Sequence, residues 1–119
     1  MATQKSPQKI LNTIIDLQGV IAVSLIGRDG FVIESASHSE IDLDALGAVA
    51  STGFGSSEVM ASELNLGTIN QTIVECDEGK ILMADCGDAI LAVVTNEEAI
   101  IGSIRHNIRK VVNELTAII

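Results

Sequence analysis

The chain has 119 residues, a formal net charge of −9 at pH 7 and hydrophobic residues at 47% of its positions, but aromatic residues at only 2%. A nucleic-acid surface needs clustered basic side chains and aromatic rings that stack on bases, so this composition argues against nucleic acid as a partner. No apolar run reaches the roughly 18 residues of a membrane span, and the N-terminus lacks the apolar core of a signal peptide. We therefore expect a single cytoplasmic domain over residues 1–119, without membrane insertion.

The first predicted element is a short helix that begins at Ser6 and Pro7. A serine hydroxyl caps the helix start, and proline is tolerated at the first helical position because its missing N–H would have no partner there. Ile10 and Ile14 lie on one side of this helix. It stops at Gly19, since glycine readily adopts the left-handed conformation found after a helix end.

Residues 20–37, VIAVSLIGRDGFVIESAS, predict two strands joined by a tight turn. The Asp29-Gly30 pair between β-branched residues is a strong hairpin signal. Arg28 lies in this turn, and we assign it no catalytic role.

A long helix is expected from Leu43 to Leu64. One stripe of this helix can lie on a sheet, and it consists of Leu43, Leu46, Ala50, Phe54, Ser57, Ala61 and Leu64. The opposite side is small or apolar, with no charge between Asp44 and Glu58, although an outward helix face is normally charged. Each internal glycine costs about 1 kcal/mol relative to alanine, so a helix with several of them needs compensating contacts. We interpret the outer face as a packing surface.

Three strands are expected at residues 68–76, 80–86 and 89–95, followed by a closing helix at 99–117. Short turns join these strands, so they are antiparallel neighbours. The order α-β-β-α-β-β-β-α predicts an α+β fold with one antiparallel five-stranded sheet covered by helices. No charged residue occurs from Asn65 to Val74, and an uncharged edge strand without proline invites pairing with another strand.

The sequence contains no convincing catalytic, metal or cofactor site. GFGSSE at residues 53–58 lacks the lysine of a phosphate-binding loop and the third glycine of a dinucleotide fingerprint. His38 and His106 are expected on the surface. Cys76 is expected opposite Lys80, and Cys86 opposite Asn70, so the two thiols are not predicted to form a disulfide. The acidic residues near the turns, Asp77, Glu78, Asp85 and Asp88, lack the spacing of a calcium motif.

Taken together, the chain resembles the roadblock/dynein-light-chain family over essentially its whole length. The most specific likeness is the hairpin GVIAVSLIGRDGFVIE at Gly19–Glu34, and the small-residue second helix before a Thr-Ile strand supports it. The likeness is greatest to prokaryotic MglB-type regulators of Ras-like GTPases. It implies profilin-like layers, with helices on both faces of the sheet.

The resemblance also implies a homodimer in which the third strands pair across a two-fold axis and the second helices lie together. Such proteins are not enzymes. They bind small GTPases, other roadblock domains or motor intermediate chains, and some accelerate GTP hydrolysis without an arginine finger. Carried to this sequence, the implied dimer and partner interface is Ala45, Ala48, Val49, Thr52, Ser56, Val59, Thr68, Asn70 and Thr72. An acidic rim that faces a GTPase would consist of Asp44, Glu58 and Glu63.

Two other functions remain open from the sequence. A domain of this architecture also suits a PAS-like or profilin-like sensor of small molecules, which would need a cavity with a few convergent polar groups. An enzyme with a cysteine nucleophile at Cys76 or Cys86 is the third hypothesis.

Overall fold

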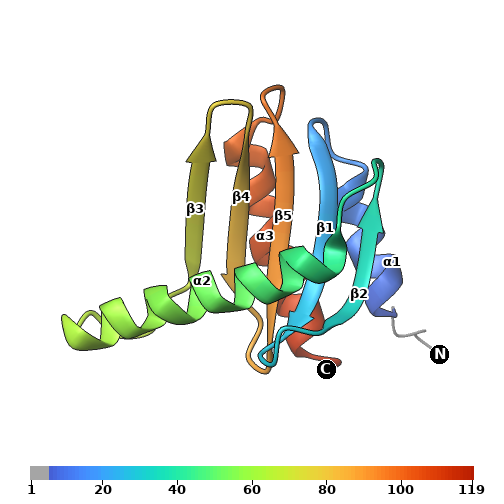
Figure 1. The fold of residues 1–119 in the computed structure, drawn as a ribbon. Helices are drawn as coiled ribbons and strands as arrows, with labels where there is room; N and C mark the ends of the chain where they lie inside the picture. The colour runs from blue at the N-terminus through green and yellow to red at the C-terminus, as the bar shows by residue number, and fades with distance from the viewer. Residues whose placement is uncertain (1–5) are drawn as a thin grey trace.

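The computed structural model describes residues 6–119, so residues 1–5 of the expected domain lie outside the described part. One antiparallel sheet with the strand order β2-β1-β5-β4-β3 forms the middle layer, with helices on both faces (Figure 1). This arrangement confirms the predicted fold class and element order. In chain order the elements are α1 (Pro7–Ile15), β1 (Val20–Gly27), β2 (Val32–Ser37), α2 (Leu43–Glu63), β3 (Gln71–Cys76), β4 (Gly79–Asp85), β5 (Ala89–Asn96) and α3 (Ile101–Thr116).

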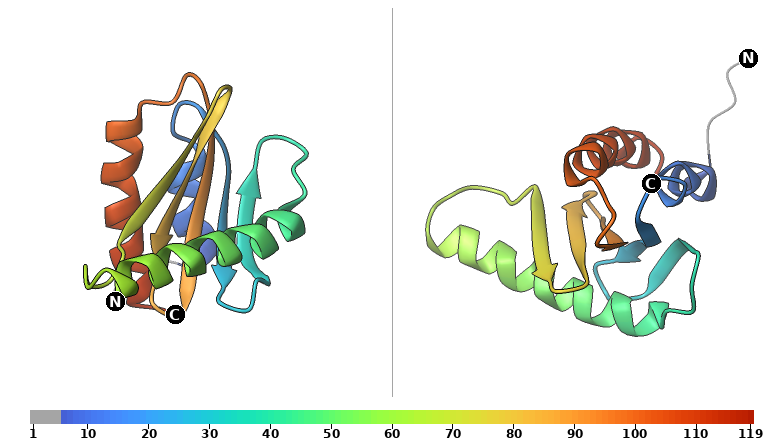
Figure 2. Two further views of the ribbon diagram at one scale, coloured as in Figure 1. Left: turned by 60° about the vertical axis from the view of Figure 1, so that its left-hand side comes forward. Right: turned by 90° about the horizontal axis from the view of Figure 1, so that it is seen from above.

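The helices α1 and α3 cover one face of the sheet, and α2 alone covers the other (Figure 2). The side chain of Ser6 accepts a hydrogen bond from the Lys9 amide, so α1 is capped as the sequence predicts. The main core lies under α1 and α3 and is built almost entirely from aliphatic side chains. Among residues 6–119, no helix has the length and apolar character needed to cross a bilayer.

The smaller core under α2 is centred on Phe54, whose side chain is fully buried. Phe54 packs with Ile26 and Ile90 of the central strands, among others. The helix runs across the strands, and its C-terminal end extends past β3 at the edge of the sheet (Figures 1 and 2). Because only the first part of α2 lies over the centre of the sheet, the apolar stripe of this helix is buried along only part of its length.

Only one of the three glycines inside α2 is explained by packing within this chain. A Cβ atom at Gly47 would lie 2.6 Å from the carbonyl oxygen of Gly30, so the helix can approach the β1–β2 turn only without a side chain there. At Gly53 and Gly55, a Cβ atom would meet nothing within 4 Å. The helix propensity lost at these two positions is therefore not compensated by close packing against any of residues 6–119.

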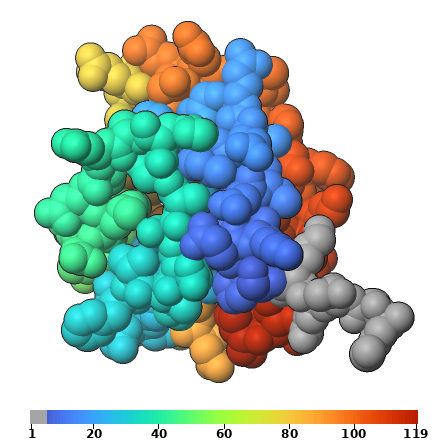
Figure 3. Space-filling view, turned by 90° about the vertical axis from the view of Figure 1, so that its right-hand side faces the viewer, coloured from blue at the N-terminus to red at the C-terminus, as the bar shows by residue number. Residues whose placement is uncertain are grey.

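The two edges of the sheet differ in how they are covered. At the β2 edge, α1 packs beside the strand, and the Gln8 side chain donates a hydrogen bond to the Ser35 carbonyl oxygen (Figure 3). At the other edge, β3 has β4 on one side only, and no helix lies over it on the α3 side in the view of Figure 1. An unpaired strand edge of this kind can add a strand from another chain.

Two details of β3 correct the sequence-based expectations. The strand begins at Gln71 rather than at residue 68, and the Asn70 carbonyl oxygen still accepts a hydrogen bond from the Asp85 amide. The register is also shifted by one residue, because the turn contains only two residues and pairs Cys76 with Gly79 instead of Lys80. The expected pairing of Cys86 with Asn70 is wrong for the same reason. Both thiols are free.

The placement of Leu64 on the sheet-facing stripe is also wrong. This side chain is 68% exposed, because α2 has passed the edge of the sheet by that point. Periodicity identifies the side of a helix that is apolar, but it cannot show where the surface beneath that helix ends.

Candidate partner-binding surface

The outward side of α2 carries little charge and many exposed small or apolar side chains. All six helix residues of the predicted interface are exposed: Ala45, Ala48, Val49, Thr52, Ser56 and Val59. The exposed fractions of Val49 and Val59 are 66% and 59%. Exposed apolar side chains in one continuous patch are typical of a surface that binds another protein.

Sequence reasoning missed three large apolar residues of the same region. Met60, Leu64 and Leu66 are 61%, 68% and 72% exposed, and they follow one another along the end of α2 and the loop after it. The lack of charge from Asn65 to Val74 was a signal for Leu66 alone, and the helical periodicity had placed Leu64 against the sheet. We use the term α2 surface for the outward residues of α2 together with Met60, Leu64 and Leu66.

The predicted strand residues lie beside the α2 surface, at the uncovered edge of the sheet. Thr68 and Asn70 are exposed in the segment before β3, and Thr72 is half-buried within the strand. The hydroxyl oxygen of Thr72 and the side-chain oxygen of Gln71 are both buried without a hydrogen-bond partner among the described residues. A buried polar atom without a partner costs about 1–3 kcal/mol, so neighbouring atoms of this kind on an edge strand indicate missing contacts.

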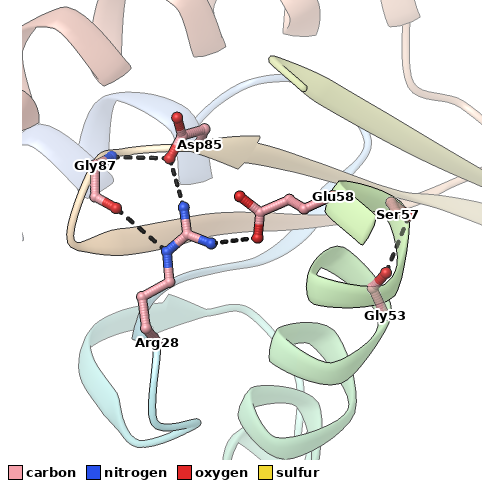
Figure 4. Close-up of polar contacts among 6 residues, drawn as sticks. All are labelled: Arg28, Gly53, Ser57, Glu58, Asp85 and Gly87. Atoms are coloured by element: carbon pink, nitrogen blue, oxygen red, sulfur yellow. Dashed lines mark hydrogen bonds and ion pairs between the residues drawn. The ribbon is translucent and has the colours of Figure 1, made fainter. Parts of the chain in front are cut away.

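The three acidic residues expected at the rim fall into two groups. Asp44 and Glu63 are exposed near the two ends of α2. Glu58 instead points back toward the sheet and pairs with Arg28 (Figure 4). Its carboxylate is therefore already paired within the chain.

Arg28 joins three separate parts of the fold. Its guanidinium donates to Glu58 Oε1 of α2 at 2.5 Å, to Asp85 Oδ1 of β4 at 2.7 Å and to the Gly87 carbonyl oxygen at 3.2 Å (Figure 4). It also lies 5.6 Å from the centre of the Phe54 ring, within the range of a cation–π contact. Although the sequence places Arg28 in a turn, the structure makes it the link between that turn, α2 and the β4–β5 turn.

The Arg28→Gln variant is expected to lose about 1–2 kcal/mol of unfolding free energy, because a network of partly exposed charges is worth more than one surface ion pair. Urea denaturation followed by far-UV circular dichroism measures this change. Lys110→Gln removes the same charge from an exposed position on α3 and should change the free energy by less than about 0.5 kcal/mol. Equal effects of the two variants would show that the Arg28 contacts add nothing specific.

The two cysteines differ in their environment. Cys76 is exposed, whereas Cys86 is buried. Burial, together with the negative charge of Asp85, raises the pKa of the Cys86 thiol to about 12. A thiol that stays protonated at neutral pH is a poor nucleophile, so Cys86 is poorly suited to the cysteine-enzyme hypothesis.

We expect a thiol reagent at pH 8 to modify Cys76 quickly and Cys86 only after unfolding. At pH 10 the Cys86 thiol of the folded protein should still be protonated and unreactive, because burial raises its pKa to about 12. The unfolded thiol ionises near its ordinary pKa of about 8.5, so ionisation favours unfolding as the pH rises above that value. Mass spectrometry of the labelled Cys76→Ser and Cys86→Ser variants measures each site separately. Fast labelling of Cys86 in the folded protein would contradict this expectation.

The remaining candidate groups do not converge on a reaction centre. His38 is exposed, and its Nε2 lies 2.8 Å from the Ile15 carbonyl oxygen, next to the end of α1. His106 is exposed on α3. Among residues 6–119, no group of three or more His, Cys, Asp or Glu side chains is arranged to hold a metal ion.

Comparison with known families places this geometry in context. The family model of the Roadblock/LC7 domain matches residues 8–95. The chain belongs to the Roadblock/LC7 family. The matched range runs from α1 through β5, so it contains the α2 surface and β3 and leaves α3 outside.

A relative within the curated proteins is the uncharacterized protein MJ0310 of Methanocaldococcus jannaschii. It is 34% identical over 109 residues, which cover 92% of this chain and 96% of that protein. Among solved structures, Myxococcus xanthus MglB has a TM-score of 0.88 at 20% identity and covers 94% of this chain and 93% of its own. A structure described as MglB with tetrameric arrangement has a TM-score of 0.86 at 17% identity, and the match covers 98% of this chain and 93% of that chain. These structural matches establish that α3 also belongs to the shared fold.

Proposed function

We propose that this single-domain Roadblock/LC7 protein forms a homodimer through β3 and the α2 surface, and that the dimer regulates or scaffolds a small Ras-like GTPase. The observation that carries the proposal is the position of α2. Its apolar C-terminal end extends past the sheet beside β3, the edge strand that no other helix or strand of residues 6–119 covers. A second copy placed at this edge would extend the sheet and cover the exposed helix.

Two independent features support self-association at this place. The unpartnered Thr72 hydroxyl belongs to the strand that would pair, so a second chain can supply the missing contact. Gly53 and Gly55 face open space, and residues without side chains allow a second helix to approach closely. The structural match described as MglB with tetrameric arrangement supports the proposal, because a protein of the same fold assembles there with further copies.

The GTPase part of the proposal rests on the likeness to MglB-type regulators and on the charge of the surface. In the dimer, Asp44 and Glu63 would remain near the ends of paired helices and could attract basic side chains of a GTPase. Glu58 is left out of this role because it pairs with Arg28. The proposal assigns the protein no arginine finger and no chemistry of its own, so any stimulation of GTP hydrolysis would come from repositioning residues of the GTPase.

The decisive experiment measures binding to purified small Ras-like GTPases encoded in the same genome. Each GTPase is loaded with GDP or with a non-hydrolysable GTP analogue, and its affinity for the chain is determined by calorimetry. We expect one of them to bind at least tenfold more tightly in one nucleotide state. Binding by none of them, or equal binding in both states, would contradict a role in GTPase regulation. Light scattering with refractive-index detection tests the dimer separately, which suits a chain without Trp or Tyr.

A further inference from the structure

A cavity of about 570 Å³ is lined by residues of α3, of β4 and of the start of β3. The helix α3 lies on the face of the sheet opposite to α2 (Figure 2). Arg105, Arg109 and Asn113 line it from successive turns of α3, and Asn70 and Gln71 line it from the start of β3. A cavity of this volume is large enough for a small organic ligand. Five side chains with nitrogen donors therefore meet in one concave site.

The electrostatics of this cavity are unusual for such an acidic chain. Only seven of its residues are lysine or arginine, against sixteen acidic ones, yet two arginines one helical turn apart line the same cavity. Neither the Arg105 nor the Arg109 side chain has an ion pair or hydrogen bond among residues 6–119. The acidic residue of the lining, Asp85, pairs with Arg28 instead. Both guanidinium groups are thus available to an anion.

The amide side chains set a second requirement for the ligand of this cavity. The side-chain oxygen of Gln71 is buried and accepts no hydrogen bond within the described residues. A bare anion would leave this acceptor unsatisfied, whereas an anion that also carries an O–H or N–H group can satisfy it. Arginine side chains hold carboxylate and phosphate groups through paired, charge-assisted hydrogen bonds.

We propose that this cavity binds a small anion whose carboxylate or phosphate group lies between Arg105 and Arg109 and whose hydrogen-bond donor reaches Gln71 Oε1. The cavity and the α2 surface lie on opposite faces of the sheet, so anion binding does not require a GTPase, although Asn70 belongs both to the cavity lining and to the proposed dimer interface. It gives the domain a ligand site of the kind that the sensor hypothesis requires.

Titrations followed by NMR of the side-chain N–H groups test the proposal. The probes are inorganic phosphate and citrate, which carry an O–H donor, and sulfate, which lacks one. We expect saturable shifts of the Arg105, Arg109 and Asn113 signals with phosphate or citrate, and at least tenfold weaker binding of sulfate. The probe that saturates at the lower concentration identifies the ligand as a phosphate or a carboxylate. Equal binding of sulfate would overturn the role of Gln71.

A matched pair of double variants distinguishes binding at a specific site from a general effect of net charge. Arg105→Gln with Arg109→Gln should weaken binding at least tenfold. Lys9→Gln with Lys110→Gln changes the net charge equally at exposed positions outside the cavity and should weaken it less than threefold. Shifts that rise in proportion to concentration without saturation, or equal losses in both variants, would overturn the proposal. Saturation by a hexaglutamate peptide but by neither small anion would also overturn it, in favour of an acidic protein segment.

Discussion

The Phe54→Ala variant is expected to lose about 3–5 kcal/mol of unfolding free energy, the usual cost of removing a buried phenyl ring. Phe54 is fully buried and is the only aromatic side chain in the core under α2. Neighbouring Ala50 and Ala92 are too small to fill the resulting cavity. Urea denaturation followed by far-UV circular dichroism, at one fixed protein concentration, gives the change.

The chain contains its own matched control. Phe31→Ala makes the same change at a side chain that is 75% exposed, so we expect a loss below about 0.5 kcal/mol. If both variants lost the same stability, α2 would not be held to the sheet by Phe54. The N-terminal part of the α2 surface would then have no fixed position, which would weaken the proposed interface as well.

The second large effect is expected from Thr52→Arg, which places an unpaired charge at the centre of the proposed dimer interface. Thr52 is exposed in the single chain, so the variant should fold with nearly unchanged stability as a monomer. Burial of the new charge between two helices should raise the dimer dissociation constant by roughly a hundredfold or more. Light scattering across a concentration series measures the shift from two chains to one.

Ser103→Arg provides the control for this variant. It adds the same charge at an exposed position on α3, away from the α2 surface, and should leave the dimer intact. If Thr52→Arg remained a dimer at the same concentrations, the interface would have to lie elsewhere. If it became a monomer that still bound the GTPase with full affinity, the dimer and the partner would use different surfaces.

Local sequence signals were sufficient to predict the order of elements. Ser6 with Pro7 marks the start of a helix, and Asp29 with Gly30 marks a hairpin, because each pair acts through the backbone of its immediate neighbours. In the closing helix, apolar residues spaced three or four apart predict one buried stripe, and Ile104, Ile108, Val111 and Leu115 are buried in α3. The small, uncharged outer face of α2 was also correctly expected to lie outside the sheet contact.

The register of β3 was mispredicted because of the length of one local turn, whereas the other main errors concern how elements that are separate in the chain lie relative to one another. Leu64 is exposed because α2 is longer than the width of sheet beneath it, and nothing in the periodicity of a helix encodes that width. The pairing of Glu58 with Arg28 joins residues thirty positions apart. The cavity lined by Arg105, Arg109 and Gln71 likewise exists only because the fold brings residues of α3 and the start of β3 to one site.

The free end of α2 has a consequence for the dynamics of the single chain. Beyond the Arg28–Glu58 pair, the last turn of the helix has exposed apolar side chains and little of the sheet beneath it. Helical turns without tertiary support open easily, so their amide hydrogens should exchange with solvent far faster than those around Phe54. Under the proposed mode of assembly, exchange at these amides would slow as the protein concentration rises. The degree of order at this helix end would then indicate the fraction of the protein that is assembled.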